Sequence, residues 1–324
     1  MTAVPRDLRG RDRPDRAMAT LAAVGGAYRS LARRPGRAPT PVDRTLHLRV
    51  AERVVVADGV VALRLAAPDG RPLPVWQPGC HLDVGLPSGR RRQYALTGDP
   101  ADRRGYRVAV RAVPGGSGSA EMHALAVGDA VAVRGPRNAF PFVVRPRMLF
   151  VAGGIGITPI APMVRAAARL GVDWRLVYTG RTRASMPFLD VLRSPRVAVR
   201  PDDEFGTPTD LLATALAGAA VYACGPPPML DALRADLPAS RATALHVERF
   251  SPPPVVGGRP FRLVLARSGV TLDVPADRTV LDVVREVRPD VSYSCRQGFC
   301  GTCRIGDTLI CTDRAAGDRL VLDL

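Results

Sequence analysis

The chain has 324 residues, a formal net charge of +16, 46% hydrophobic residues and 23% charged residues. This length predicts two or three domains with separate cores, and the composition is typical of globular proteins. All of the basic residues are arginine, and aromatic residues make up 5% of the chain. Because side chains that could stack on bases are scarce, the positive charge does not indicate a nucleic-acid-binding protein. No apolar stretch approaches the roughly 20 residues of a membrane span, so no transmembrane segment is expected.

Residues 1–43 form an arginine-rich extension. Asp7, Asp12 and Asp15 stand among its arginines, which argues against an organellar transit peptide, and its apolar run over 20–27 is too short for a secretory signal. We expect an arm that carries one short helix. Free thiolates later in the chain fit a reducing compartment, so the predicted localisation is cytoplasmic.

Residues 44–145 predict a small antiparallel β-barrel. Short apolar strands are expected at 46–50, 60–65, 106–111 and 130–134, with turn signals such as Pro68-Asp69-Gly70 between them. Regularly spaced short strands without long helices are typical of this architecture.

Two motifs in this segment indicate a site for a phosphate and a flat ring. Arg92 and Tyr94 are two residues apart on a strand, so they lie on one face, where the guanidinium can pair with a phosphate and the phenol can pack beside a flavin. Gly118 and Ser119 open a short helix whose backbone N–H groups and positive end favour the same phosphate. A glycine-rich hairpin capped by serine is the structural alternative for this second motif.

The pattern changes in residues 146–250. A strand is expected at 148–152, a glycine turn at 153–158, a helix at 159–170 and a strand at 174–178. This βαβ order predicts a parallel sheet and an α/β nucleotide-binding domain.

The glycine turn of this domain can admit a pyrophosphate close to the backbone at a helix start. The residues expected to contribute are Gly153, Gly154, Gly156, Thr158 and Pro159. The pattern is not G-x-G-x-x-G, so a plain tight turn is the alternative.

Cys224, Gly225 and Pro226 follow a later strand of the same domain. Ligands of α/β sheets bind beyond the carboxyl ends of the strands, which favours a functional thiol at this position. A buried cysteine that packs as a small apolar residue is the alternative.

A proline- and glycine-rich linker at 251–258 precedes a last segment, 259–324, where strands at 261–266 and 271–274 and a helix at 280–287 are expected. Four cysteines follow this helix. Cys295, Cys300 and Cys303 have the C-x4-C-x2-C spacing of plant-type [2Fe–2S] ferredoxins, with Cys311 as the later fourth ligand.

Gly298 and Gly301 stand between these cysteines and allow backbone N–H groups to face the cluster sulfurs. A structural zinc site is the alternative, because Cys300 and Cys303 form a C-x2-C pair and zinc also takes four thiolates.

Taken together in this order, the motifs resemble the phthalate dioxygenase reductase and vanillate demethylase reductase family over residues 44–324. The matching motifs are Arg92-x-Tyr94, Gly118-Ser119-x-x-Met122-His123, Gly153 to Pro159, Cys224-Gly225-Pro226 and the Cys295 run. The resemblance implies a multidomain fold: an antiparallel flavin β-barrel, an α/β nucleotide-binding domain with a parallel sheet, and a shortened α+β ferredoxin domain of the β-grasp type.

The resemblance also implies an NAD(P)H-dependent oxidoreductase that uses FMN as its flavin, because the extra adenine contacts of the FAD-binding relatives are not found. NADH is the implied donor. Arg181, Arg183 and Ser185 could accept a 2′-phosphate, which leaves NADPH open.

Electron counting gives the expected mechanism, because hydride carries two electrons and an iron–sulfur cluster accepts one, so a flavin must stand between them. Hydride transfer is expected over Ala95, with Cys224 and Pro226 shaping the nicotinamide pocket. Electrons then leave singly through the cluster to a Rieske oxygenase or a cytochrome P450. The sequence does not indicate the substrate of that partner or the oligomeric state.

Two features depart from the family pattern. Ala95 stands where relatives carry serine or threonine, whose hydroxyl can hydrogen-bond the flavin. Only residues 304–310 separate Cys303 from Cys311, where relatives have a much longer segment. At up to about 3.3 Å per residue this span can still close a loop.

The shortened segment leaves two rival hypotheses. One is an NAD(P)H:flavin or dye reductase with a degenerate ferredoxin domain. The other is a non-enzymatic binding module that keeps the fold and holds zinc.

Overall fold

A computed structural model describes residues 43–190, 192–250, 255–293, 296, 298 and 301–324, together with Thr20 and Val24. The helix expected in the N-terminal extension and residues 251–254 of the expected linker therefore lie outside the described residues. Within the described part of the chain, no helix has both the length and the apolar character needed to cross a bilayer.

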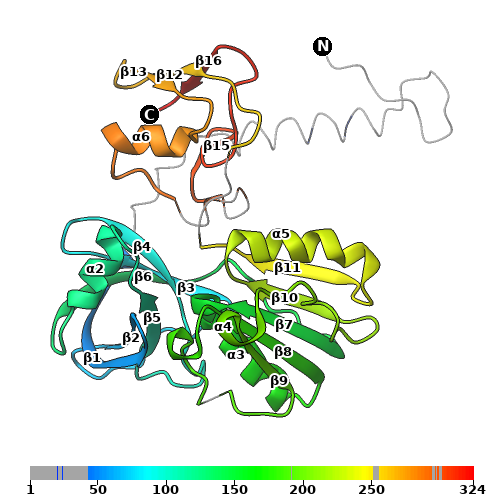
Figure 1. The fold of residues 1–324 in the computed structure, drawn as a ribbon. Coiled ribbons are helices and arrows are strands. Elements are labelled where there is room, and N and C mark those ends of the chain that lie inside the picture. The colour runs from blue at the N-terminus through cyan, green and yellow to red at the C-terminus, as the bar shows by residue number, and fades with distance from the viewer. Residues whose placement is uncertain are drawn as a thin grey trace. The chain divides into compact units, whose positions relative to one another are not determined.

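The first sheet is antiparallel, with the strand order β4-β3-β6-β1-β2-β5 (Figure 1). Its two outer strands meet, because Leu96 just after β4 pairs with Val108 of β5 and the Thr97 N–H donates to the Arg107 carbonyl at 2.9 Å. The sheet thus closes, and the predicted barrel is confirmed. The strands are β1 (Leu46–Ala57), β2 (Val60–Ala66), β3 (Cys80–Gly85), β4 (Arg91–Ala95), β5 (Tyr106–Arg111) and β6 (Ala130–Asn138).

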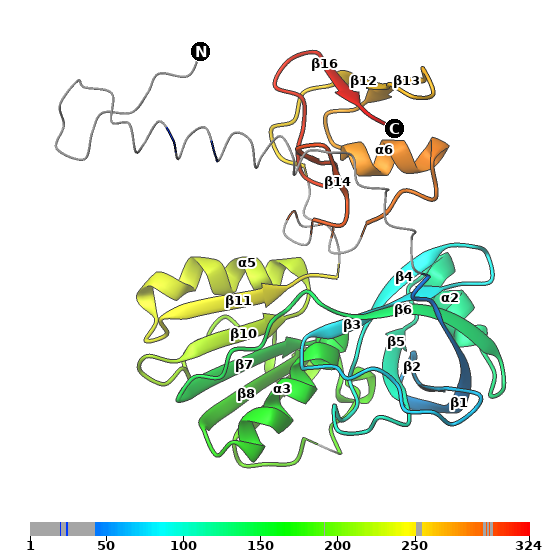
Figure 2. The same ribbon diagram turned by 180° about the vertical axis from the view of Figure 1, so that it is seen from behind.

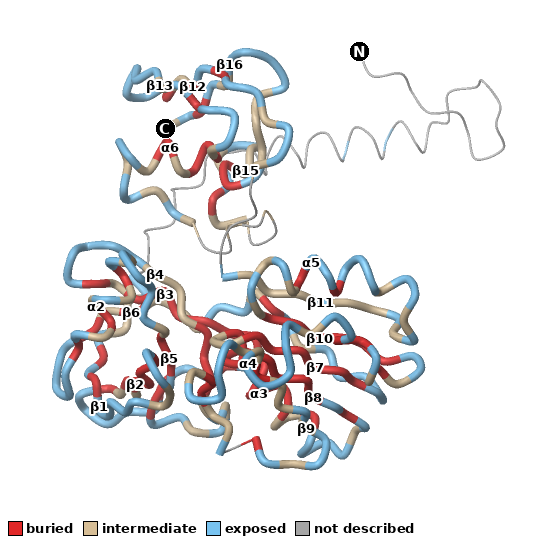
Figure 3. Tube along the Cα trace, in the orientation of Figure 1, coloured by how far each residue is buried: buried red, intermediate tan, exposed pale blue. Residues whose placement is uncertain are grey.

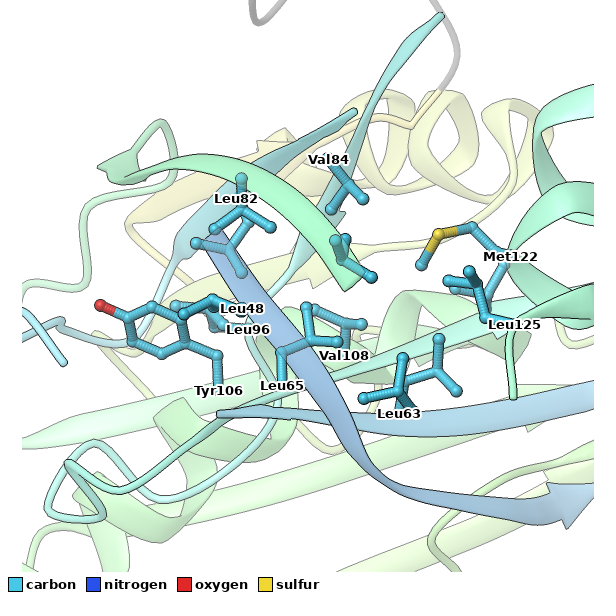
Figure 4. Packing of buried hydrophobic residues seen from close by; sticks show 14 of the residues in the cluster. Leu48, Leu63, Leu65, Leu82, Val84, Leu96, Tyr106, Val108, Met122 and Leu125 are labelled. Carbon is cyan, nitrogen blue, oxygen red and sulfur yellow. The ribbon is translucent and has the colours of Figure 1, made fainter. Parts of the chain in front are cut away.

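The inside of the barrel is filled by alternate residues of its strands, as the period of two along a strand requires. Leu63 and Leu65 of β2 are fully buried there, and Met122 of helix α2 (Ser117–Ala124) lies among the same side chains (Figure 4). Tyr106 is also fully buried, and its hydroxyl donates to the Pro74 carbonyl at 2.7 Å. This packing fixes α2 against the barrel.

The second sheet is parallel, with the order β11-β10-β7-β8-β9. Helix α3 (Ile157–Arg169) packs on one face, where it lies across β7 and β8 (Figure 2), and α5 (Pro227–Asp236) packs on the other. The central strands are buried on both faces (Figure 3), as parallel strands between helices must be. The strands are β7 (Arg147–Gly153), β8 (Asp173–Gly180), β9 (Val197–Pro201), β10 (Ala220–Cys224) and β11 (Ala244–Glu248).

Short helical turns connect the strands at the carboxyl edge of this sheet. They are η1 (Gly154–Gly156), η2 (Arg183–Ser185) and α4 (Asp202–Phe205), and η3 (Leu237–Ala239) follows α5. The predicted βαβ domain is confirmed.

The C-terminal segment forms a small α+β unit. Strand β12 (Phe261–Leu265) pairs antiparallel with β13 (Thr271–Val274) and parallel with β16 (Arg319–Leu322). Helix α6 (Val280–Val287) begins at a capping box formed by Thr279 and Asp282, and its apolar side packs on the three strands.

Candidate functional site

The two predicted flavin motifs of the barrel lie against each other. A Cβ atom on Gly118 would sit 3.0 Å from both Cγ and Nε of Arg92, so the Arg92 side chain lies directly against the start of α2. The Tyr94 hydroxyl donates to the Gly118 carbonyl at 3.4 Å. Burial raises the pKa of Tyr94 to about 12, so the phenol is neutral and can donate. A cation, a phenol and a helix start therefore converge, and this set fits the phosphate and ring of a flavin.

Ser119 and Met122 hold α2 in place. The Ser119 hydroxyl accepts from the Val113 N–H at 3.0 Å and donates to the Gly116 carbonyl at 2.8 Å, which fixes the turn before the helix. Met122 is fully buried in the barrel core. These contacts make both residues positioning groups in this structure, and direct contact with a flavin remains a prediction for them and for Ala95, which is buried at the end of β4.

The glycine turn after β7 touches the Cys224-Gly225-Pro226 motif after β10. A Cβ atom on Gly153 would lie 2.6 Å from Cδ of Pro226, and one on Gly156 would lie 2.1 Å from the Cys224 carbonyl oxygen. The neighbouring Thr158 hydroxyl donates to the Ile155 carbonyl at 2.9 Å, and Pro159 is buried in α3. The glycines therefore let the turn pack directly against the end of β10 at the start of α3, where pyrophosphate binding is predicted.

Arg111 is a candidate site residue that the sequence did not indicate. It ends β5 of the barrel, its Nη2 donates to the Ser185 carbonyl at 2.6 Å, and it is the nearest group to a Cβ atom built on Gly154, at 3.8 Å. Burial lowers the pKa of Arg111 from its usual high value, and nearby Arg181 adds to this effect. The guanidinium thus places a cation of the barrel beside the glycine turn. Its only signal in the sequence is a charge at the end of an apolar strand.

Cys224 ends β10 at the carboxyl edge of the sheet. It is fully buried and stands in register between Ala152 of β7 and Glu248 of β11. Burial raises the pKa of Cys224 well above its ordinary value, and Glu248 raises it further. The residue is therefore a neutral thiol rather than a nucleophilic thiolate, and its role in shaping a nicotinamide pocket stays a prediction.

Glu248 is a second residue that the sequence did not indicate. Its Oε2 atom is buried and has no hydrogen-bond partner within the described residues, and burial raises the pKa of the carboxyl to about 8. A carboxyl group can stay buried in this way because it keeps its proton near neutral pH.

Glu248→Gln is expected to change how stability depends on pH. The unfolded chain releases this proton near pH 4.5 and the folded chain holds it to about pH 8. The wild-type free energy of unfolding therefore falls as pH rises through this window, by at most about 1.4 kcal/mol per pH unit. The variant lacks this loss, so its Tm should exceed that of the wild type by about 5 °C or more at pH 8 and approach it at pH 5.

Thermal melts between pH 5 and pH 8 measure this difference. Asp236→Asn, an exposed carboxyl at the end of α5, is the control and should run parallel to the wild type. A difference in Tm between Glu248→Gln and the wild type that does not vary with pH would contradict the raised pKa of Glu248.

Residues 304–310 form a tight hairpin that returns the chain to its starting point. Strands β14 (Arg304–Ile305) and β15 (Thr308–Leu309) pair around Gly306, whose φ of 58° is in the left-handed region. The Ile310 N–H donates to the Cys303 carbonyl at 3.3 Å. The shortened segment therefore brings Cys311 back beside Cys303.

The two described cysteines form a paired sulfur site. Cys303 and Cys311 are both 2% exposed and hydrogen-bond each other. Burial and the neighbouring Cys303 raise the pKa of Cys311 to about 11, whereas the Gly298 N–H, which donates to its sulfur, lowers it. Such a buried thiol pair gains most from a bound metal, which converts thiols to thiolates. Cys295 and Cys300 lie outside the described residues, so their part in the site remains a prediction.

Gly298 and Gly301 of the cysteine loop both have left-handed backbone angles. Gly298 has φ of 87° and Gly301 has φ of 70°. A Cβ atom on Gly298 would also meet Thr312 Oγ1 at 3.0 Å. Both glycines thus allow turns that other residues rarely adopt, and the pair of buried sulfurs with the Gly298 N–H donor fits an iron–sulfur cluster.

Comparison with known proteins bears on all three units. Residues 47–142 match the oxidoreductase FAD-binding domain, and residues 263–318 match the 2Fe-2S iron-sulfur cluster binding domain. Phthalate dioxygenase reductase of Burkholderia cepacia is 32% identical, over 87% of this chain and 98% of the relative. The chain belongs to the phthalate dioxygenase reductase family.

Other relatives agree. Toluene-4-sulfonate monooxygenase system reductase subunit TsaB1 of Comamonas testosteroni is 37% identical, over 85% of this chain and 98% of the relative. The solved structure of a phthalate dioxygenase reductase is 32% identical and superposes with a TM-score of 0.68, over 87% of this chain and 98% of that one. Full-length CYP116B46 of Tepidiphilus thermophilus is 38% identical with a TM-score of 0.68, over 90% of this chain and 44% of that one. The chain thus spans less than half of that cytochrome P450.

Membership of the phthalate dioxygenase reductase family confirms several predictions. The chain is an oxidoreductase, a reductase with a flavin domain, a parallel-sheet nucleotide domain and a [2Fe–2S] domain. The match to an iron–sulfur domain favours iron over the zinc alternative.

Proposed function

We propose that this reductase oxidises NADH, binds FMN and passes single electrons through its [2Fe–2S] cluster to a separate oxygenase, either a Rieske oxygenase or a cytochrome P450. The names of the relatives support such a partner, because they describe reductases of monooxygenase and dioxygenase systems and a P450 chain. The proposed domains are those of the sequence prediction, and the proposed compartment is the cytoplasm.

A bound flavin would supply the conversion of a two-electron donor to one-electron output. The chain's own residues would hold and orient the reactants. Arg92 and the first N–H groups of α2 would bind the flavin phosphate, with Tyr94 beside the ring. The glycine turn after β7 would admit the dinucleotide phosphates, and Cys224 with Pro226 would border the nicotinamide without donating or removing a proton.

The observation that carries the proposal is the return of Cys311 to Cys303 through the β14–β15 hairpin. A dye reductase with a degenerate ferredoxin domain would not need two buried sulfurs in contact. The hairpin therefore favours the electron-transfer reductase over that alternative.

A visible spectrum and two acceptors test the proposal. Purified protein should show flavin and iron–sulfur absorbance, release FMN rather than FAD on denaturation, and reduce cytochrome c with NADH. Ferricyanide reports NADH oxidation without the cluster. Flavin absorbance alone, with ferricyanide reduction but no cytochrome c reduction, would refute cluster-mediated transfer and support the dye reductase.

Ala95→Ser is expected to speed NADH oxidation. Ala95 is buried at the end of β4, and a hydroxyl there would add a donor toward the flavin that this chain lacks. One such contact in a transition state is worth about 2.7–4 kcal/mol in other enzymes, so a gain of about 100-fold or more in ferricyanide reduction is expected. Stopped-flow flavin reduction measures it directly. An unchanged rate would show that the missing hydroxyl is irrelevant.

A further inference from the structure

Two residues of opposite charge follow the neighbouring strands β8 and β9, beside the glycine turn. In the order β7-β8-β9, Gly180 at the end of β8 is in register with Pro201 at the end of β9. Arg183 follows β8 and Glu204 follows β9. Because nucleotides bind along the carboxyl edge of an α/β sheet, the adenosine half of the donor is expected over these two ends once its phosphates occupy the turn after β7. This step rests on the proposed NADH oxidation.

Arg183 and Glu204 form a two-pronged ion pair across this edge. Nε of Arg183 donates to Oε1 of Glu204 at 2.9 Å, and Nη2 donates to Oε2 at 2.6 Å. The two side chains are 51% and 41% exposed, so a ligand can reach both. The Asp203 N–H donates to the Arg181 carbonyl at 3.1 Å, which joins the loop after β8 to helix α4. This backbone bond holds the two segments that carry the pair close together.

Arg181, Arg183 and Ser185 are the groups predicted to accept a 2′-phosphate, and two of them already bond to other groups of the chain. Glu204 takes the edge of the Arg183 guanidinium that a phosphate would need. The Ser185 hydroxyl donates to the Thr182 carbonyl at 2.8 Å and closes a capping box with that residue. Two of the three predicted groups serve the chain's own structure.

An exposed ion pair adds little to folding stability, but it sets the charge that a bound nucleotide contacts. The 2′-phosphate of NADPH brings about two negative charges, which a carboxylate repels. The 2′-hydroxyl of NADH is neutral and can donate to the same carboxylate, the pairing that acidic residues provide in dinucleotide-binding domains. Glu204 thus acts oppositely on the two donors.

We propose that Glu204, by holding Arg183, makes this reductase select NADH against NADPH. Glu204 is the specificity-determining residue, and Arg183 is the group whose release would admit the 2′-phosphate.

Glu204→Gln tests the proposal in two ways. With ferricyanide as acceptor, kcat/KM for NADPH should rise about tenfold, while kcat/KM for NADH should fall or stay the same. Isothermal titration of adenosine 2′,5′-bisphosphate and of 5′-AMP measures the same preference without any redox step. The affinity for the bisphosphate should rise relative to 5′-AMP. An unchanged ratio between the two ligands would overturn the proposal.

Two further variants isolate the cause. Asp173→Asn removes the same charge from an exposed pair with Arg196 at the opposite, amino end of β8, where the N–O distance is 3.4 Å, and should leave the donor preference unchanged. The double variant Glu204→Gln with Arg183→Gln should lose the gain for NADPH. A gain that persists in the double variant would contradict the role of Arg183.

The wild-type protein separates this inference from the proposed function. Failure of the wild type to oxidise NADH with ferricyanide would refute the proposed function. The titration of 5′-AMP against the bisphosphate would still decide whether Glu204 discriminates.

Discussion

Cys311→Ala is expected to abolish the iron–sulfur absorbance, the EPR signal after dithionite reduction and the reduction of cytochrome c by NADH, while ferricyanide reduction continues near the wild-type rate. Cys311 is 2% exposed and its sulfur hydrogen-bonds Cys303. Its loss would leave an iron of the cluster without a thiolate in an apolar pocket, where no water ligand can easily replace it. The two acceptors then separate loss of the cluster from loss of hydride transfer.

Cys80→Ala is the matched control, because Cys80 is also a buried cysteine but packs in the barrel core. Its variant should keep the cluster signals and cytochrome c reduction. A Cys311→Ala protein that retains a [2Fe–2S] EPR signal would place the fourth ligand elsewhere. It would also remove the main support for the function proposed above.

Helix α6 shows where local sequence was sufficient. The helix was expected at 280–287, and the structure has it over the same residues. A capping box sets its start and a regular apolar face sets its length, so both signals are local. Strand β3, in contrast, was not predicted. His81 and Asp83 interrupt its apolar pattern, yet both are buried, since Asp83 accepts from Gln93 and pairs with Arg137.

The candidate site divides in the same way. Spacing alone predicted the cysteine ligands and the glycine motifs, because these residues would serve the chemistry through backbone and sulfur. Spacing could not indicate Arg111 or Glu248, because each lies beside a partner that is distant in the sequence. Arg111 lies beside the glycine turn after β7, and Glu248 lies beside Cys224. The contact of Cys311 with Cys303 likewise depends on the turn at Gly306. Sequence showed that the span was short, but not that a hairpin fills it.

Gly156→Ala is expected to eliminate NADH oxidation with both acceptors while the cluster EPR signal remains. Its backbone is right-handed helical, with φ of −61°, so the constraint is space rather than conformation. A Cβ atom would lie 2.1 Å from the Cys224 carbonyl oxygen, a backbone atom at the end of β10, which lies between β11 and β7 in the sheet and cannot rotate away.

Relief of this clash must move the glycine turn from β10, at a cost of about 1–3 kcal/mol for an overpacked site, and displace the N–H groups that would bind the dinucleotide. A lower Tm and weaker 5′-AMP binding should accompany the loss of activity. Gly317→Ala is the control, because a Cβ atom there meets nothing within 4 Å. If Gly156→Ala kept wild-type turnover and Tm, the turn could not lie against β10, and the phosphate site would have to be sought elsewhere on the sheet. The cluster should survive in this variant because Cys303 and Cys311 belong to a separate core around β12 and α6, so Cys311 and Gly156 test the two ends of the proposed electron path independently.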